Sequence, residues 1–359
     1  MTHELHTVAT GGTLDSKWEP SKDTAVPNDE SIVPRYFENV RLPQHNVTHE
    51  TVCLKDSRDI DADLQDKIAA VIAESIYKKI LAVTGTYLMP DFARGVKEHP
   101  ASKRFKQMRK RVVLTGSGTP MNGYLRSDGG FNLGMGTAVL QEDTDALISI
   151  VMNGMCLDVE RGIKKDLTKA ILGSSDRKND VLGYNNFTLI PVGGSIDFEP
   201  DGLDGVIPAR NSIIPAYLRE NVHLQKDFDA INPCVKDSRE LKDEDIDLVV
   251  DIIKESTSEH TLITLGIYDI RRVQEELQKK LEGAKDRKII LTGSRYPLAS
   301  TDMTDATFNL GYALGKMPFA QNGVNVALNG MLLEDDDNII ELLFTKEEQE
   351  KLKAANVTK

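Results

Sequence analysis

Hydroxyl side chains lie in four short motifs of the first half of the chain, three of which also contain glycine. The motifs are Gly11-Gly12-Thr13, Asp56-Ser57-Arg58, Gly85-Thr86-Tyr87 and Thr115-Gly116-Ser117. Glycines let a ligand approach the backbone and present its N–H groups to the ligand. A hydroxyl becomes a nucleophile when a proton acceptor lies within hydrogen-bond reach. Together these residues indicate a site for a small polar molecule, with nucleophilic chemistry open to it.

The second half of the chain repeats the motifs in the same order. Gly193-Gly194-Ser195 corresponds to the first motif, and the offset drifts only from 182 residues (Gly12 to Gly194) to 176 (Asn153 to Asn329). Such constancy indicates two copies of one structural unit. The remaining repeated segments are Lys55–Asp59 with Lys236–Glu240, Thr84–Tyr87 with Leu265–Tyr268, Leu114–Ser117 with Leu291–Ser294, Phe131–Gly134 with Phe308–Gly311, and Asn153–Met155 with Asn329–Met331.

Short apolar runs alternate with segments of helical periodicity in both halves, which predicts mostly parallel, helix-covered sheets. We therefore expect an α/β fold of two tandem flavodoxin-like units around an approximate two-fold axis. Their predicted bounds are 1–175 and 183–359, with a polar linker over 173–184. The four hydroxyl-containing motifs lie at the ends of predicted strands. Open parallel sheets bind ligands at the carboxyl ends of their strands. The predicted strands of the first unit are Leu5–Thr10, Thr51–Leu54, Lys79–Thr84, Val112–Thr115 and Ala146–Met152.

The composition excludes several classes of function. A net charge of -12 over 359 residues argues against binding to nucleic acid or to an anionic membrane. No apolar run approaches membrane-spanning length, and the N-terminus does not resemble a signal peptide. Three cysteines without a Cys-x-x-Cys pair fit a reducing cytoplasm. His45 and His49 have no matching ligands nearby, so we expect neither a metal nor a cofactor.

The ordered motifs resemble those of the bacterial-type L-asparaginase family. Ala9–Ser16 is similar to the first signature of that family, and the likeness continues through Asp56–Asp59, Thr84–Thr86, Leu114–Gly116, Ser127–Leu133 and Met152–Gly154. The resemblance covers nearly all of the first unit and most of the second. It implies the N-terminal domain of an asparaginase, present here in two copies.

The resemblance also implies roles for individual residues. Thr13 would be the nucleophile that attacks a side-chain amide carbon, and Thr86 with Lys164 would assist it. Ser57, with Arg58, would bind the carboxylate and amino groups of the substrate, beside Gly12, Gly85 and Tyr87. A desolvated lysine can accept the proton of the threonine, backbone N–H groups can hold the oxyanion, and ammonia can leave after protonation.

Three departures from the family pattern affect the expected activity. Tyr87 replaces an aspartate that would orient Lys164 and balance an α-ammonium group. Residues 16–33 contain no tyrosine, although Trp18 is present, whereas the family places an activating tyrosine there. A second copy of the first unit stands in place of the smaller C-terminal domain of the family. A substrate without an α-amine, or a slow enzyme, becomes the expectation.

The second unit has lost the residues to which the resemblance assigns chemistry. Ser195, Ile267 and Ile340 occupy the places of Thr13, Thr86 and Lys164, so we expect this unit to be catalytically inert. Structural roles remain open for the first unit as well. Gly-Gly-Thr can simply form a turn, Lys164 can be a surface lysine, and the Asp-Ser-Arg motif can brace a loop.

Other repeated residues are expected to serve the fold. Tyr36 matches Tyr217, and we expect both rings to pack against helices. Asp128 and Asp305 precede the Phe-Asn-Leu-Gly segments and are predicted to cap helices.

The leading hypothesis is hydrolysis of a small carboxamide to a carboxylate and ammonia. The partner would be a small amide or an acidic amino acid, with a homo-oligomer possible. One alternative is a catalytically dead relative that binds a small acidic metabolite or a protein partner. Another is an ammonia-yielding subunit of an amidotransferase assembly.

Overall fold

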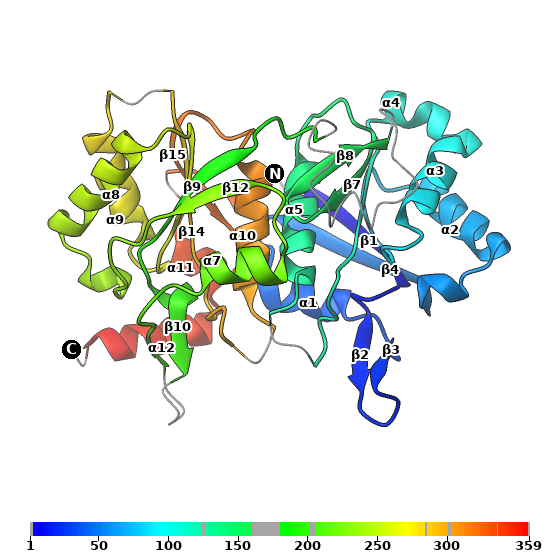
Figure 1. Cartoon of the computed structure of the whole chain (residues 1–359), viewed down its shortest axis with the longest axis horizontal. Coiled ribbons are helices and arrows are strands. Elements are labelled where there is room, and N and C mark those ends of the chain that lie inside the picture. Colours follow the sequence, from blue (N-terminus) through cyan, green and yellow to red (C-terminus); the bar gives the residue numbers. More distant parts are fainter. Residues whose placement is uncertain are drawn as a thin grey trace.

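Two six-stranded sheets lie on either side of a central pair of helices in a computed structural model of the chain (Figure 1). The structure describes residues 3–123, 126–159, 180–200, 206–283, 286–300, 303–335 and 337–357. The first sheet and its helices come from the first half of the chain, and the second sheet comes from the second half.

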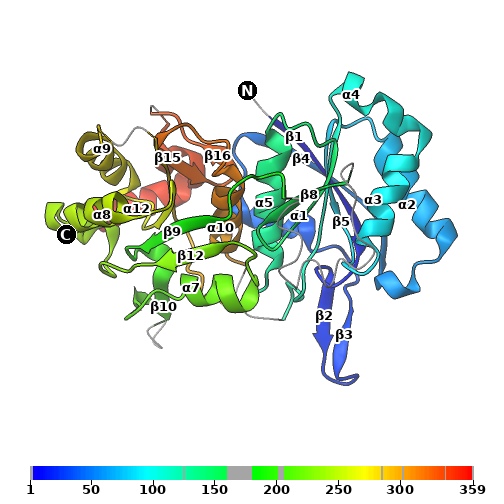
Figure 2. The same ribbon diagram turned by 45° about the horizontal axis from the view of Figure 1, so that its top comes forward.

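The first sheet has the strand order β4-β1-β5-β6-β7-β8. The strands are parallel except for β8, which forms an antiparallel hairpin with β7. Their bounds are β1 His3–Gly11, β4 His45–Lys55, β5 Lys79–Val83, β6 Arg111–Thr115, β7 Ile148–Met152 and β8 Met155–Asp158. The small hairpin of β2 (Ser16–Glu19) and β3 (Thr24–Pro27) projects away from this sheet (Figure 2).

The second sheet has the equivalent order β12-β9-β13-β14-β15-β16, again with only its last pair antiparallel. Its strands are β9 Asn186–Pro191, β12 Asp227–Ala230, β13 His260–Thr264, β14 Lys288–Thr292, β15 Gly323–Leu328 and β16 Met331–Leu332. A separate hairpin joins β10 (Phe198–Pro200) to β11 (Val206–Pro208). The predicted α/β class with two mostly parallel, helix-covered sheets is confirmed.

Helices cover both faces of each sheet. The first half contains α1 Val33–Val40, α2 Ala62–Glu74, α3 Met89–Glu98, α4 Phe105–Met108 and α5 Gly129–Gln141. The second half contains α7 Ile214–Ala216, α8 Asp243–Glu255, α9 Ile270–Lys280, α10 Asp305–Lys316, α11 Ile339–Leu343 and α12 Lys346–Val357. No helix in the described ranges is both long and apolar enough to cross a membrane.

The apolar side chains form one central cluster and two outer clusters. The central cluster joins both halves around α5 and α10, while the outer clusters lie beneath α2 and α3 in the first half and beneath α8 and α9 in the second. Both ribbon views place α5 and α10 side by side between the sheets (Figures 1 and 2). Every described residue of α5 except Gln141 is buried, because this helix is covered on all sides.

Two glycines permit the close approach of α5 and α10. A Cβ atom on Gly134 would overlap the carbonyl oxygen of Phe308, and one on Gly311 would overlap that of Phe131. Gly134 and Gly311 are equivalent residues, and so are Phe308 and Phe131, so each glycine makes the same contact with the other half. This reciprocity indicates an approximate two-fold relation at the centre of the molecule.

Buried tyrosines repeat this reciprocity on either side of the central helices. The Tyr36 hydroxyl lies 3.0 Å from Thr307 Oγ1 at the start of α10, and the Tyr217 hydroxyl donates to the Ser127 carbonyl oxygen near the start of α5 at 3.0 Å. Tyr36 and Tyr217 are 1% and 0% exposed. The prediction that this pair packs against helices is confirmed, and each tyrosine reaches the helix of the other half.

Hydrogen bonds join three of the repeated motifs, those that contain Gly116, Asn132 and Asn153. Asn132 donates to the Gly116 carbonyl oxygen at 3.0 Å, and its own side-chain oxygen accepts from the Asn153 backbone N–H at 3.0 Å. Asn309 makes the equivalent bonds to Gly293 and Asn329. These asparagines tie the ends of two strands to the buried helix, so their recurrence in both halves follows from the fold.

The predicted capping by Asp128 and Asp305 is wrong. The Asp128 carboxylate accepts from the backbone N–H groups of Gly118 and Thr119 and makes no capping bond to α5. Asp305 lies inside α10, whose cap is the Thr304 hydroxyl. Both carboxylates satisfy N–H groups of the loop after a central strand, which burial would otherwise leave without partners.

The polar linker predicted over 173–184 stays a prediction, because most of it is not described by the structure. Residues 173–179 lie outside the described ranges. Asp180 forms a 2.7 Å ion pair with the buried Lys226, while Leu182 and Tyr184 are 3% and 4% exposed. Leu182 and Tyr184 are buried because they pack into the central cluster.

Candidate active site

The ends of β1 and β5 meet at the point where the strand order of the first sheet reverses. In open α/β sheets this is the place where ligands bind. Gly12 has a φ of 81°, and a Cβ atom there would overlap the backbone of Gly85. A Cβ atom on Gly85 would in turn lie 2.7 Å from the Ser57 hydroxyl oxygen. The structure therefore brings Gly12, Gly85 and Ser57 into direct contact, as the sequence led us to expect.

Thr13 follows Gly12 on a tightly braced turn. Ser16 Oγ donates to the Gly12 carbonyl oxygen at 2.8 Å, and the Ser16 N–H donates to the Thr13 carbonyl oxygen at 3.2 Å. Thr13 itself is half-buried, and neither its hydroxyl nor its backbone N–H is bonded to another described residue. The turn thus holds the Thr13 main chain while leaving a hydroxyl and an N–H available to a ligand.

Asp15 anchors the far side of the same turn. Its carboxylate accepts from the Ile32 N–H at 2.7 Å and from the Ser31 hydroxyl at 3.0 Å. Burial raises the pKa of this carboxyl to about 6. Asp197 makes the corresponding bonds to Ile213 and Ser212, so this anchor belongs to the shared fold.

Thr86 lies half-buried after β5, beside two hydroxyl groups that lack partners. Its methyl group lies 3.6 Å from the position of a Cβ atom on Gly116. The Thr84 and Ser117 hydroxyls are buried, and neither has a hydrogen-bond partner among the described residues. Leaving such groups unpaired costs roughly 1–3 kcal/mol each. Buried hydroxyls that are left unpaired at this free-energy cost are typical of sites that bind a polar ligand or water.

Sequence reasoning missed Thr84 and Ser117 as site residues. The signal was present at Thr84, because the residue at the corresponding place in the second half is Leu265. No equivalent signal existed at Ser117, because Ser294 conserves the hydroxyl.

Arg58 is exposed and bound to its own loop. Its guanidinium donates to the two carboxylate oxygens of Asp56 at 3.0 and 2.8 Å, and Arg239 does the same with Asp237. The Asp56 pair holds the pKa of that carboxyl below its usual value. Of the two roles that the sequence left open for Arg58, this geometry favours loop bracing over ligand binding.

The remaining predicted residues lie apart from this contact. Tyr87 points into solvent, with 67% of its surface exposed. Lys164 lies outside the described residues. In the described part of the chain, no three His, Cys, Asp or Glu side chains are placed to share a metal ion.

The same place in the second sheet is closed. The Ser195 hydroxyl donates to the Ser294 carbonyl oxygen at 2.5 Å, and Ser294 Oγ donates to the Tyr296 carbonyl oxygen at 2.6 Å. Leu265 and Ile267, which replace Thr84 and Thr86, belong to the outer apolar cluster and are 0% and 1% exposed. The second unit keeps the backbone of the site but fills the places of Thr84 and Thr86 with hydrocarbon and bonds the Ser195 hydroxyl within the unit.

Comparison with known proteins supports the asparaginase likeness of the first half. Residues 4–171 match the family model described as asparaginase, N-terminal, which is less than half of the chain. No curated protein matches. The likeness of the second half therefore rests on its repeated motifs and equivalent strand order.

Solved structures with detectable similarity include three asparaginases. L-asparaginase I from Vibrio cholerae is 19% identical with a TM-score of 0.36; the alignment covers 43% of this chain and only 46% of that protein. A probable cytoplasmic L-asparaginase from Campylobacter jejuni is 14% identical with a TM-score of 0.40, over 88% of this chain and 96% of that one. The thermostable L-asparaginase from Thermococcus kodakarensis is 15% identical with a TM-score of 0.34, over 87% of this chain and 93% of that one.

Proposed function

We propose that the first unit, residues 1–175, is an asparaginase-like amidohydrolase that uses Thr13 as its nucleophile. The observation that carries this proposal is the contrast between Thr13 and Ser195. Both follow a Gly-Gly turn at the switch point of a parallel sheet, but only the Thr13 hydroxyl is free of hydrogen bonds to described residues. The family match over residues 4–171 supports the same reaction class.

The proposed reaction proceeds through an ester on Thr13. The hydroxyl oxygen attacks the amide carbon while its proton passes to the Lys164 amine, with Thr86 aligning the pair. The N–H of Thr13, which has no described hydrogen-bond partner, would donate to the oxyanion. Collapse of the intermediate breaks the C–N bond, and the transferred proton leaves with ammonia. Water then cleaves the ester to give the carboxylate and restores the Thr13 hydroxyl.

The substrate we propose is a small carboxamide that carries a carboxylate. Ser57, in contact with Gly85, would donate its hydroxyl to that carboxylate. Tyr87 supplies no counter-charge for an α-ammonium group. A deamino substrate such as succinamate should therefore compete well with asparagine.

The second unit, residues 183–359, is proposed to be a catalytically inert partner that completes the central core. Ile340, the residue at the position of Lys164, lies in the short helix α11 and carries no proton-transfer group. The three cysteines are free thiols, which supports a reducing cytoplasm as the location. The proposed partner remains a small amide or acidic amino acid.

Ammonia release provides the test, with a matched pair of variants. Purified protein is assayed with asparagine, glutamine and succinamate, and Thr13→Ala is compared with Ser195→Ala. We expect Thr13→Ala to reduce turnover by at least about 10³-fold, since removing a nucleophile abolishes the covalent route. Ser195→Ala should change turnover by less than about twofold, because its hydroxyl bonds only to its own unit.

Equal losses in both variants would contradict a single active unit. Absence of ammonia from all three amides, together with thermal stabilisation by succinate, would instead favour a binding protein that has kept the scaffold.

A further inference from the structure

A cleft of about 810 Å³ opens between the two halves, away from the residues of the candidate active site. Its described walls are α1, residues 121–123 and 126–130 around the start of α5, and residues 296–300 and 303–307 around the start of α10. A volume of this size accommodates a small organic molecule. The two loops are equivalent segments of the two units, so the cleft lies where the halves meet.

The inner surface of the cleft combines apolar side chains with an aromatic ring. Met121, Leu298 and Met303 supply the apolar surface, and the Tyr296 ring is 39% exposed. Methionine and aromatic side chains accommodate flat, apolar groups. This lining suits the ring or hydrocarbon body of a ligand.

The charged side chains of the cleft favour an anion. Arg35 and Arg126 are exposed, and neither forms an ion pair or hydrogen bond with a described residue. Among the described lining residues Glu38 is the acidic one, so this described lining carries one more positive than negative charge in a chain of net charge -12. Unpaired guanidinium groups bind carboxylates and phosphates through two parallel hydrogen bonds.

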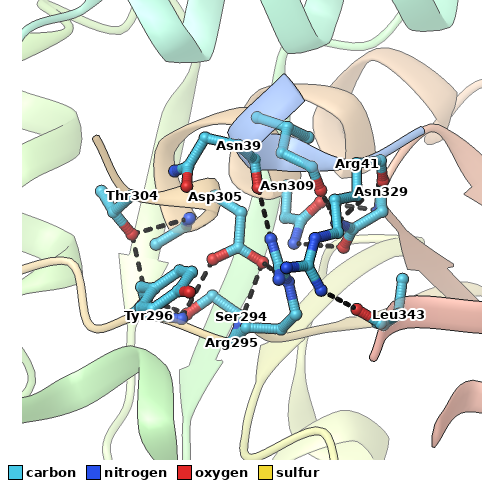
Figure 3. Close-up of polar contacts among 12 residues, drawn as sticks. Asn39, Arg41, Ser294, Arg295, Tyr296, Thr304, Asp305, Asn309, Asn329 and Leu343 are labelled. Atoms are coloured by element: carbon cyan, nitrogen blue, oxygen red, sulfur yellow. Dashed lines mark hydrogen bonds and ion pairs between the residues drawn. The ribbon is translucent and has the colours of Figure 1, made fainter. Parts of the chain in front are cut away.

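The wall from the second half is held in place by a buried network (Figure 3). The Asp305 carboxylate accepts from the N–H groups of Arg295 and Tyr296 at 3.0 Å each, and the Thr304 hydroxyl donates to the Tyr296 carbonyl oxygen at 2.9 Å. Arg295 also donates across the interface to the Asn39 carbonyl oxygen on α1. The cleft is therefore preformed, which lowers the entropic cost of binding.

The two walls from the first half are each bonded to the turn that carries Thr13. The Met121 N–H points to the Leu14 carbonyl oxygen at 3.5 Å. The Asp15 carboxylate binds the Ile32 N–H at the start of α1 at 2.7 Å. Leu14 and Asp15 directly follow Thr13, so a displacement of either wall acts on the nucleophile turn.

We propose that this cleft binds a small molecule with an apolar ring and an anionic head, and that its occupancy changes the conformation of the Thr13 turn. Arg35 and Arg126 hold the carboxylate or phosphate, while Tyr296 and the methionines hold the ring. The binding site stands independently of the proposed amidase; an effect on turnover would rest on that proposed function.

Trp18 provides a reporter for the test. It is the only tryptophan of the chain, and its backbone nitrogen lies 3.9 Å from the position of a Cβ atom on Gly123, a residue of the cleft. The probes are phenylacetate and phenyl phosphate, which share a ring and differ in the anion. Benzyl alcohol is the neutral control. Binding is measured by calorimetry, and Trp18 emission is followed with excitation at a wavelength that the probes do not absorb.

We expect saturable binding of at least one anionic probe, with a parallel change in Trp18 emission. Arg35→Ala and Arg126→Ala should each weaken binding by about tenfold, whereas the exposed Arg210→Ala should leave it unchanged. The Thr13→Ala variant should bind as the native protein does, which separates this site from the proposed reaction.

Three results would overturn the proposal. Neither probe binds at about 10 mM, or the double Arg35→Ala, Arg126→Ala variant retains native affinity, or benzyl alcohol binds as tightly as the anions. Binding that leaves the Trp18 emission unchanged would remove the proposed link to the Thr13 turn.

Discussion

The two halves of this chain share a backbone and differ in what fills it. In the first half, the end of β5 carries Thr84 and Thr86, whose surroundings leave a buried hydroxyl without a partner. In the second half, the same positions carry Leu265 and Ile267 within an apolar cluster. The first arrangement costs stability and the second adds to it. This difference teaches that the fold needs the glycine turns in both halves, whereas folding does not account for the polar groups around Thr13.

The largest effect we expect concerns what the halves share, the crossing of α5 and α10. Gly134→Ala or Gly311→Ala would place a methyl group against a backbone carbonyl, and neither helix can move without disturbing the central cluster. We expect a loss of about 3 kcal/mol or more in the free energy of unfolding, measured by urea denaturation.

Gly283→Ala is the control for that pair, because nothing lies within 4 Å of its added Cβ atom. Unchanged stability in Gly134→Ala would show that the helices do not meet as closely as described.

Exchanging the residues that differ between the halves sharpens the comparison. Thr86→Ile should lower ammonia release by at least about 100-fold, because it removes a hydroxyl from the proposed proton path. It should leave the free energy of unfolding equal or higher. The reciprocal Ile267→Thr should cost about 1–3 kcal/mol, because Ile267 is 1% exposed in an apolar cluster.

Stability and turnover are measured on the same preparations of both variants. If Thr86→Ile lost stability as well as turnover, Thr86 would be a structural residue and the difference between the halves would carry no functional meaning.

The smallest effect concerns the paired buried carboxyls Asp15 and Asp197. Burial raises the pKa of each from 3.8 to about 6, so the folded state retains a proton that the unfolded state releases. These groups therefore stabilise the fold most in acid, and that contribution declines as the pH rises from about 4 to about 6. We expect Asp15→Asn and Asp197→Asn each to remove up to about 2 kcal/mol of this decline.

The free energy of unfolding of each variant must be compared with that of the native protein at each pH. His45 changes the pH dependence of stability in the opposite direction. Burial lowers the pKa of His45 to about 3, so stability falls as the pH drops below 6.5. Urea denaturation between pH 4 and pH 7 provides the measurement. Only Asp15→Asn should also alter ammonia release, and an equal change in Asp197→Asn would argue against an active site confined to the first half.

Sequence periodicity predicted the sheets because buried parallel strands have a strong apolar pattern. The predicted Lys79–Thr84 strand differs from β5 by one residue, and Val112–Thr115 lies within β6. The polar residues were harder to interpret. Asp128 and Asp305 preceded helices and suggested caps, but they bind loop N–H groups that are distant in sequence from the helix start.

The candidate site was predicted in part for the same reason. Gly12, Gly85 and Ser57 were expected together because each follows a neighbouring parallel strand, and they are in contact. The Arg58 ion pair with Asp56 and the exposure of Tyr87 depend on side-chain conformations that no spacing encodes.

The amino-acid sequence by itself determined the alternation of strands and helices and the position of the glycine turns, because these follow from local periodicity and from backbone geometry that only glycine tolerates. Only the tertiary structure decided which hydroxyls are satisfied and where the two halves leave a charged cleft. Those properties depend on groups from distant segments meeting at one place, where burial and hydrogen bonding are settled by all the neighbours at once.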